Sequence, residues 1–146
     1  MKKTLLITAL LVLTGSAFAQ ASPAGLWKTI DDTTKKERSL IRISDNSGVF
    51  IGRIDKRLDA DAKPTDVCDL CTDDRKGKPI EGLELIRGVK KSGDEGLWDG
   101  GEIVDPDNGK TYKVRLKPID GGKKLEVRGY IGMPMLGRTQ TWIRVE

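Results

Sequence analysis

Apolar and polar residues alternate along most of the chain, and this period-two pattern restricts the fold more than any other feature. It is clearest in 110–117, where Tyr112, Val114 and Leu116 share one face and Lys113, Arg115 and Lys117 share the other. Such alternation is typical of a β-strand with one buried and one solvated face. The pattern recurs in the segments 26–30, 40–43, 49–54, 83–89, 97–104, 124–128 and 139–145. We therefore expect an all-β protein of about eight strands.

Short turn-forming clusters separate these segments. Asp45–Gly48, Asp105–Gly109 and Asp120–Gly122 combine Asp, Asn and Gly, the residues that favour tight connections between antiparallel strands. No stretch of ten or more residues carries an amphipathic helical stripe. An up-and-down meander is therefore the expected topology.

The two ends of the strand series carry large aromatic residues. The first segment contains Gly25 and Trp27, and the last contains Trp142 followed by Arg144. A sheet that pairs its own first and last strands has no exposed edges. We therefore expect a small antiparallel barrel, closed at these four residues.

The first residues have the features of a secretory signal peptide. Lys2 and Lys3 precede an apolar run over 5–13, and small residues follow up to Ala19. The run is too short to span a bilayer, and no second long apolar stretch follows it. We expect cleavage after Ala19, with Ala21 as the alternative end. Since the leader contains no cysteine, we expect a periplasmic or secreted protein that is not a lipoprotein.

The remaining residues, 20–146, have the length of one domain. Loss of the two leader lysines lowers the formal net charge from +4 to about +2. Charges of both signs are interspersed, and no basic run is threaded with aromatic residues. We therefore expect no nucleic-acid partner, and a monomer or weak dimer.

A long polar segment, about 56–81, contains the pair Cys68 and Cys71. Haem attachment is excluded because Thr72 stands where a histidine is required. Four aspartates between residues 66 and 74 disfavour a reactive thiolate. Zinc would need two further ligands from a chain without histidine. A disulfide is the favoured interpretation, with thiol exchange and metal binding as alternatives, and it should pin the loop.

Few bulky residues are available to fill the barrel, so a ligand space is one interpretation of its interior. Glycines within the strands also suit bends and bulges that curl the sheet. The candidate ligand or portal residues are aromatic side chains and the apolar residues of the last hairpin. They are Phe50, Trp98, Tyr112, Tyr130, Met133, Met135 and Leu136.

Several of these segments together resemble a known family. They are Gly25-x-Trp27, the two cysteines, the segment 98–106 and the ending 128–144. The chain after the leader resembles, over nearly its whole length, the secreted bacterial family called domain of unknown function 2147. That family resembles lipocalins and other calycins in fold. The resemblance implies a barrel closed by its first and last strands, with Arg144 stacked on Trp27, and it implies no established activity.

No catalytic constellation is visible. Serine and threonine have no histidine partner, and the carboxylates lie among lysines and arginines without an isolated acid and base. We therefore expect a non-enzymatic protein without cofactor or metal. The first function class is a lipocalin-like carrier of a small apolar or amphipathic ligand. The alternative is an envelope interaction module that uses basic residues such as Lys113 and Arg128 against anionic lipid, polysaccharide or a protein.

Overall fold

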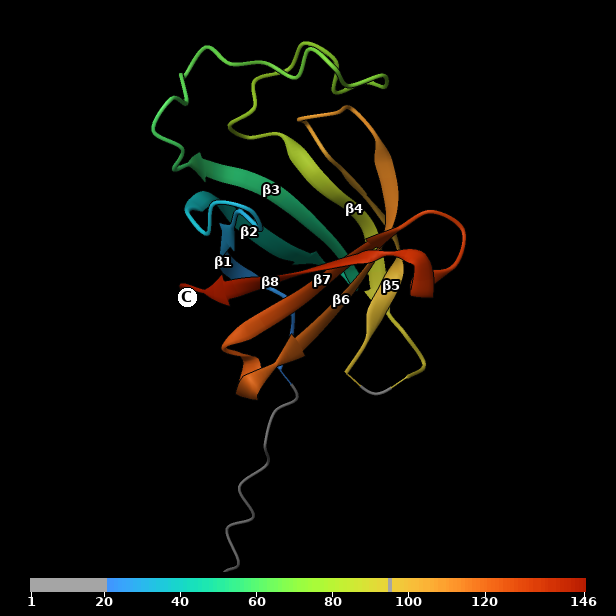
Figure 1. The fold of residues 1–146 in the computed structure, drawn as a ribbon. Helices are drawn as coiled ribbons and strands as arrows, with labels where there is room; N and C mark the ends of the chain where they lie inside the picture. Colours follow the sequence, from blue (N-terminus) through green and yellow to red (C-terminus); the bar gives the residue numbers. More distant parts are fainter. Residues whose placement is uncertain (1–20, 95) are drawn as a thin grey trace, which may run out of the picture.

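The computed structural model describes residues 21–94 and 96–146, so the expected signal peptide lies outside the described residues (Figure 1). Eight antiparallel strands form a closed barrel in chain order. They are β1 (Gly25–Ile30), β2 (Glu37–Asn46), β3 (Val49–Arg57), β4 (Glu84–Lys91), β5 (Trp98–Val104), β6 (Thr111–Ile119), β7 (Lys124–Tyr130) and β8 (Arg138–Arg144). Two short 3-10 turns, η1 (Asp120–Gly122) and η2 (Pro134–Leu136), follow β6 and β7. The expected all-β, eight-stranded barrel is confirmed.

The alternating residues occupy the expected faces. Val114 and Leu116 are fully buried, while Lys113 and Lys117 on the same strand are exposed. The turn after β2 has positive φ at Ser47 and Gly48, the conformation of a two-residue hairpin turn. None of the helices in the described part of the chain has the length and apolar character needed to cross a bilayer.

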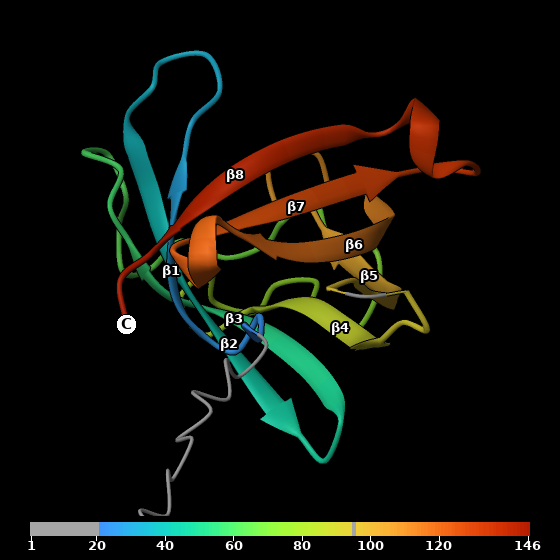
Figure 2. The same cartoon turned by 90° about the horizontal axis from the view of Figure 1, so that it is seen from below.

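The barrel closes through a short seam. β1 pairs with β8 at Trp27↔Arg144 and Lys28↔Ile143, whereas β7 pairs with β8 along six positions. Beyond this seam the two strands diverge, as Figure 2 shows. Beyond the seam, backbone pairing between β1 and β8 therefore ends.

Connections after the odd-numbered strands all lie at one end of an up-and-down barrel. They are the loops 31–36, 58–83, 105–110 and 131–137. The core extends through the barrel, and at the other end Phe50 and Trp98 pack edge to face with ring centroids 6.2 Å apart. At Gly101 a side chain would collide with the carbonyl oxygen of Arg87, so the sheet curves tightly at this position.

Candidate functional site

The closed end of the barrel is built around Trp27 and Arg144. Trp27 is completely buried, and its Nε1 donates a hydrogen bond of 2.8 Å to the carbonyl oxygen of Pro23. The Arg144 guanidinium carbon lies 4.1 Å from the Trp27 ring centroid. Gly25 has a φ of 142°, and a side chain there would collide with the Arg144 guanidinium. The stacking that the family resemblance implied is therefore present, and Gly25 leaves room for it.

Arg144 also ties three chain segments together. Its guanidinium donates hydrogen bonds to the carbonyl oxygens of Ser22 at 2.8 Å, Ala24 at 2.9 Å and Gly122 at 2.5 Å. Burial lowers the pKa of Arg144 from its ordinary value. The charge is compensated by carbonyl dipoles and the indole face, which makes this end a structural lock.

The opposite end of the barrel contains a cavity of about 790 Å³. Its wall includes several strand residues, most of them apolar. They are Thr29, Ile41, Ile54, Leu85, Ile103, Tyr112, Val127 and Trp142. Charged side chains of the loops form its rim. The volume lies within the range of small-molecule sites.

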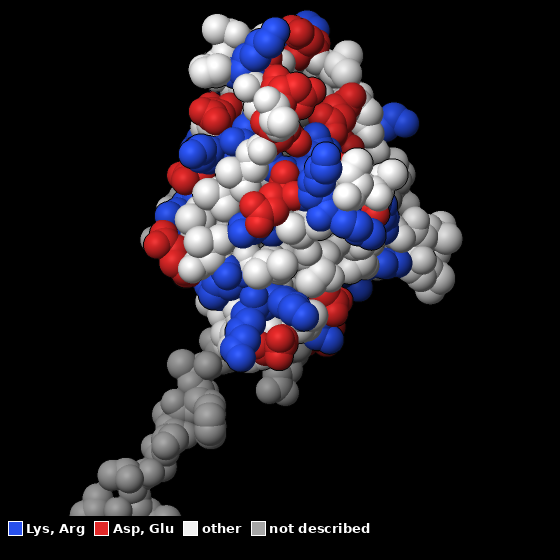
Figure 3. Space-filling view, turned by 60° about the vertical axis from the view of Figure 1, so that its left-hand side comes forward, with Lys and Arg blue, Asp and Glu red and all other residues white. Residues whose placement is uncertain are grey.

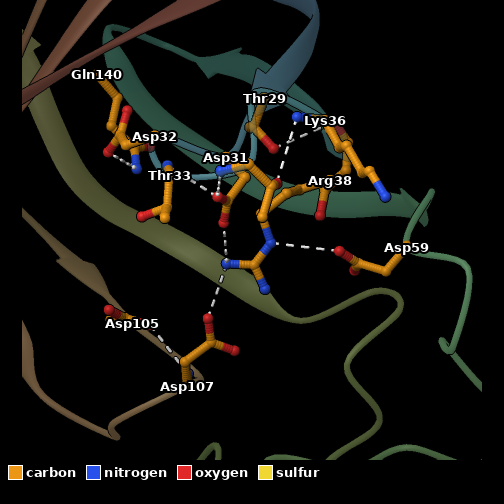
Figure 4. Close-up of polar contacts among 12 residues, drawn as sticks. Thr29, Asp31, Asp32, Thr33, Lys36, Arg38, Asp59, Asp105, Asp107 and Gln140 are labelled. Carbon is orange, nitrogen blue, oxygen red and sulfur yellow. Dashed lines mark hydrogen bonds and ion pairs between the residues drawn. The ribbon is translucent and has the colours of Figure 1, made fainter.

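Arg38 of β2 is the central residue of the rim (Figure 4). Its Nη1 lies 2.8 Å from Asp107 Oδ2 and 3.9 Å from Asp31 Oδ2, and its Nε lies 3.3 Å from Asp59 Oδ1. The hydrogen bond to Asp107 raises the pKa of Arg38 above its ordinary value. These carboxylates come from the connections after β1, β3 and β5, so one guanidinium joins three loops across the mouth.

The neighbouring aspartates are held by further donors. Arg57 binds Asp59 at 3.0 Å and Asp66 at 2.6 Å. The backbone N–H of Thr34 lowers the pKa of Asp31, so this carboxyl group is ionised at neutral pH. The described residues contain no cluster of three or more side chains suited to holding a metal ion. The rim is therefore an ion-pair network.

A separate set of side-chain contacts joins the β1–β2 connection to β8 beyond the backbone seam. Asp32, after β1, forms an ion pair with Arg138 and accepts a 3.2 Å hydrogen bond from Gln140 Nε2. Gln140 Oε1 in turn accepts a 3.1 Å hydrogen bond from Trp142 Nε1, and the Trp142 ring lines the cavity. Side chains therefore bridge the divergence where backbone pairing ends.

The long loop is folded around its disulfide. Cys68 and Cys71 are bonded and buried, and the described chain has no free cysteine. Backbone hydrogen bonds join Cys68 to Lys78 at 2.8 Å and to Gly77 at 2.9 Å. The expected disulfide is confirmed. The loop runs from 58 to 83 rather than from about 56 to 81, because strand pairing extends β3 to Arg57.

Arg75 anchors the same loop to the barrel wall, although the sequence did not single it out. It is fully buried, with its Nη1 donating to the carbonyl oxygen of Glu84 at 3.0 Å. Its Nη2 lies 2.5 Å from Asp73 Oδ2 and 3.4 Å from Glu102 Oε1. Because each of its three nitrogen atoms has an acceptor, the guanidinium is accommodated without exposure to solvent.

The structure brings one of the seven expected ligand or portal residues to the cavity. Tyr112 lines it, whereas Phe50 and Trp98 are buried beside the β2–β3 turn at the other end. The remaining four do not line the cavity, and they occupy the end of β7 and the loop after it. They are Tyr130, Met133, Met135 and Leu136.

Sequence reasoning missed the rim residues Arg38, Asp59 and Asp107. They lie in polar segments that resemble ordinary solvated turns. The usable signal was topological, because loops after the odd-numbered strands of a meander must meet at one end. Figure 3 shows why composition alone did not help, since acidic and basic side chains are mixed over the face of the molecule drawn there.

Comparison with known proteins agrees with this architecture. The family described as "Uncharacterized protein conserved in bacteria (DUF2147)" matches residues 25–144. Among curated proteins there is no match. A solved structure of similar fold is protein HP1028 from the human pathogen Helicobacter pylori, described as belonging to the lipocalin family. It is 22% identical, with a TM-score of 0.73, and the alignment covers 86% of this chain and 84% of that one. The match across all eight strands shows that this chain belongs to the DUF2147 family and has a lipocalin-like barrel.

Proposed function

We propose that this chain is a secreted or periplasmic, non-enzymatic binding protein that takes a small amphipathic molecule into its barrel. The observation that carries the proposal is the cavity of about 790 Å³ at the open end. A filled barrel would have no room for a ligand, whereas this volume suits a molecule of drug or short-lipid size. The lipocalin-like fold supports the same class of function.

The lining argues for an amphipathic rather than a wholly apolar ligand. Side chains such as Ile41, Ile54 and Val127 provide an apolar wall, and Tyr112 and Gln140 add hydrogen-bonding groups. Charged groups of the rim, centred on Arg38, stand at the mouth. An apolar portion therefore gains by burial in the wall, while a polar end keeps hydrogen bonds at the rim.

The proposed entry route passes between the loops that Arg38 joins. Its three carboxylate contacts are exposed enough to exchange with water, since the Arg38 side chain retains 36% of its accessible surface. Their separation would widen the mouth without breaking any strand pairing. The disulfide at Cys68 keeps the longest loop folded as this rearrangement occurs.

Cavity filling tests the proposal directly. Gly129 lines the cavity, and a Cβ there would meet its nearest neighbour, Tyr112, at 3.6 Å, an ordinary contact. Gly129→Leu therefore places a side chain in the ligand space without backbone strain. Gly93→Leu is the matched control, because Gly93 lies in the β4–β5 connection with no atom near its Cβ position.

The binding assay uses N-phenyl-1-naphthylamine, an apolar probe whose fluorescence rises in a dry pocket. We expect saturable binding to the natural protein and to Gly93→Leu, and at least tenfold weaker binding to Gly129→Leu. Native mass spectrometry of protein isolated from its own host should show a bound small molecule that Gly129→Leu lacks. Absence of saturable probe binding, or equal binding by both variants, would remove the carrier proposal.

The proposed location has its own test. Cell fractionation should place the protein in the periplasm or medium, and its first residue should be Gln20, or Ser22 if cleavage follows Ala21. A cytoplasmic protein that retains its first 19 residues would contradict export.

A further inference from the structure

The loop between β7 and β8 exposes an unusual amount of apolar surface. Ile131, Met133, Met135 and Leu136 are 66%, 56%, 73% and 76% exposed. All four lie within six consecutive residues, and η2 within this loop has no buried residue. Scattered apolar residues are common on protein surfaces, but a concentrated group indicates an interaction site. We call residues 131–136 the apolar tip.

The tip has a fixed shape. Leu136 N–H donates to the carbonyl oxygen of Met133 at 3.0 Å, which closes the short turn. Arg128 Nε donates to the carbonyl oxygen of Pro134 at 2.6 Å, and its Nη1 donates to Thr139 Oγ1 at 2.7 Å. The bond to Pro134 joins the tip to β7, and the bond to Thr139 joins the same arginine to β8. The tip therefore presents its side chains outward at little further cost in conformational entropy.

Basic side chains extend from the tip along the outside of the barrel. The outward positions of β6 and β7 hold five basic residues and one acidic residue, Glu126. The five are Lys113, Arg115, Lys117, Lys124 and Arg128. Arg128 is bound by a carbonyl and a hydroxyl group, so its charge is not neutralised by those contacts. Glu126 lies opposite Lys117 in the strand register, away from the tip.

We propose that the apolar tip and the basic face of β6 and β7 bind the surface of an anionic lipid bilayer. Figure 2 shows the β7–β8 loop projecting at the end of its hairpin. A projecting apolar loop is buried best by a deformable apolar partner, and the basic face is stabilised by negative charge next to it. A bilayer of anionic lipids provides both, because apolar side chains enter the acyl boundary while Lys and Arg remain at the headgroups.

The strand topology relates the position of the apolar tip to that of the cavity. The β7–β8 loop follows an odd-numbered strand, so it lies at the same end of the barrel as the mouth. Docking through the tip would hold that end near the lipid. Membrane docking goes beyond the proposed ligand binding, and it stands even if the cavity binds nothing.

Vesicle co-sedimentation tests the proposal. The protein is used as recovered from its host, with mass spectrometry showing that residues 1–19 are absent. Vesicles contain either phosphatidylcholine alone or phosphatidylcholine with phosphatidylglycerol. We expect binding to the anionic vesicles, weaker binding at high salt, and an approximately tenfold loss in Leu136→Ser, as expected for one buried leucine. Leu70→Ser is the control, since Leu70 is 55% exposed on another loop.

Two further variants separate the two parts of the surface. Lys113→Gln with Arg128→Gln should reduce the preference for anionic vesicles, while Met135→Ser should weaken binding at every lipid composition. No binding to anionic vesicles would overturn the proposal, as would equal losses in Leu136→Ser and Leu70→Ser. Self-association that depends on Leu136 in sedimentation velocity, without vesicle binding, would assign the tip to a second copy of the chain and also overturn it.

Discussion

Trp27→Ala removes a side chain that is fully buried against Arg144 at the closed end of the barrel. Large-to-small replacement of a buried tryptophan costs about 3 to 5 kcal/mol. Area gives a similar figure, since a buried aromatic side chain of roughly 150–250 Å² contributes about 4 to 6 kcal/mol as an upper estimate. The free energy of unfolding of such a domain is about 5 to 15 kcal/mol, so we expect much of it to be lost.

The assay is urea unfolding followed by far-UV circular dichroism, because the substitution itself alters tryptophan fluorescence. Trp27→Phe is the control. It keeps an aromatic face for Arg144 but loses the hydrogen bond to Pro23, and we expect it to cost less than Trp27→Ala. A loss below about 1 kcal/mol for Trp27→Ala would refute the structural lock.

A double-mutant cycle isolates the stacking itself. Arg144→Met removes the guanidinium, with its hydrogen bonds to three carbonyl oxygens, in both the natural and the Trp27→Ala background. The cation–π part should appear as a coupling energy of about 0.5 to 2 kcal/mol with Trp27→Ala as the second change. A coupling energy indistinguishable from zero would mean that the carbonyl contacts, rather than the indole face, hold Arg144.

Three further perturbations test other parts of the structure. Cys68→Ser should lower the free energy of unfolding by about 2 kcal/mol and increase amide exchange in the long loop, because the bond closes a short segment. Gly101→Ala should reduce the unfolding midpoint strongly, since its Cβ meets the Arg87 backbone, while Gly93→Ala changes it little; equal effects would contradict the close approach. The Arg87 side chain holds the pKa of Asp74 well below its ordinary value of 3.8. The ion pair stabilises the folded protein at pH values above 3.8, and this stabilisation is lost as the pH falls toward the lower pKa that Asp74 has in the folded state. Below about pH 4, the free energy of unfolding of Asp74→Asn should therefore depend less steeply on pH than that of the natural protein.

The alternation of apolar and polar residues was sufficient to predict the strands, because one face of each strand contacts the core and the other contacts water. The alternation around Val114 and the turn chemistry at Ser47 and Gly48 are local properties, readable without knowing the partner strands. The large aromatic residues Trp27 in the first strand and Trp142 in the last also indicated closure, since a sheet that pairs its own first and last strands leaves no exposed edge.

The candidate site was predicted less completely. Tyr112 was identified correctly as facing inward, but an inward aromatic residue at Phe50 lies at the packed end rather than at the cavity. Periodicity assigns a residue to a face, and it does not give its height along the barrel axis. That height depends on strand register and tilt, which are properties of the closed sheet.

The sequence by itself determined an all-β chain with paired ends, a disulfide within a long polar loop, and an apolar final hairpin. Only the tertiary structure decided that Arg38 meets Asp59 and Asp107 across the mouth, and that a cavity lies at this end of the barrel. Such contacts join residues 21 and 69 positions apart. A long-range ion pair leaves no local pattern, because an arginine and an aspartate in a solvated turn look the same whether or not folding brings them together.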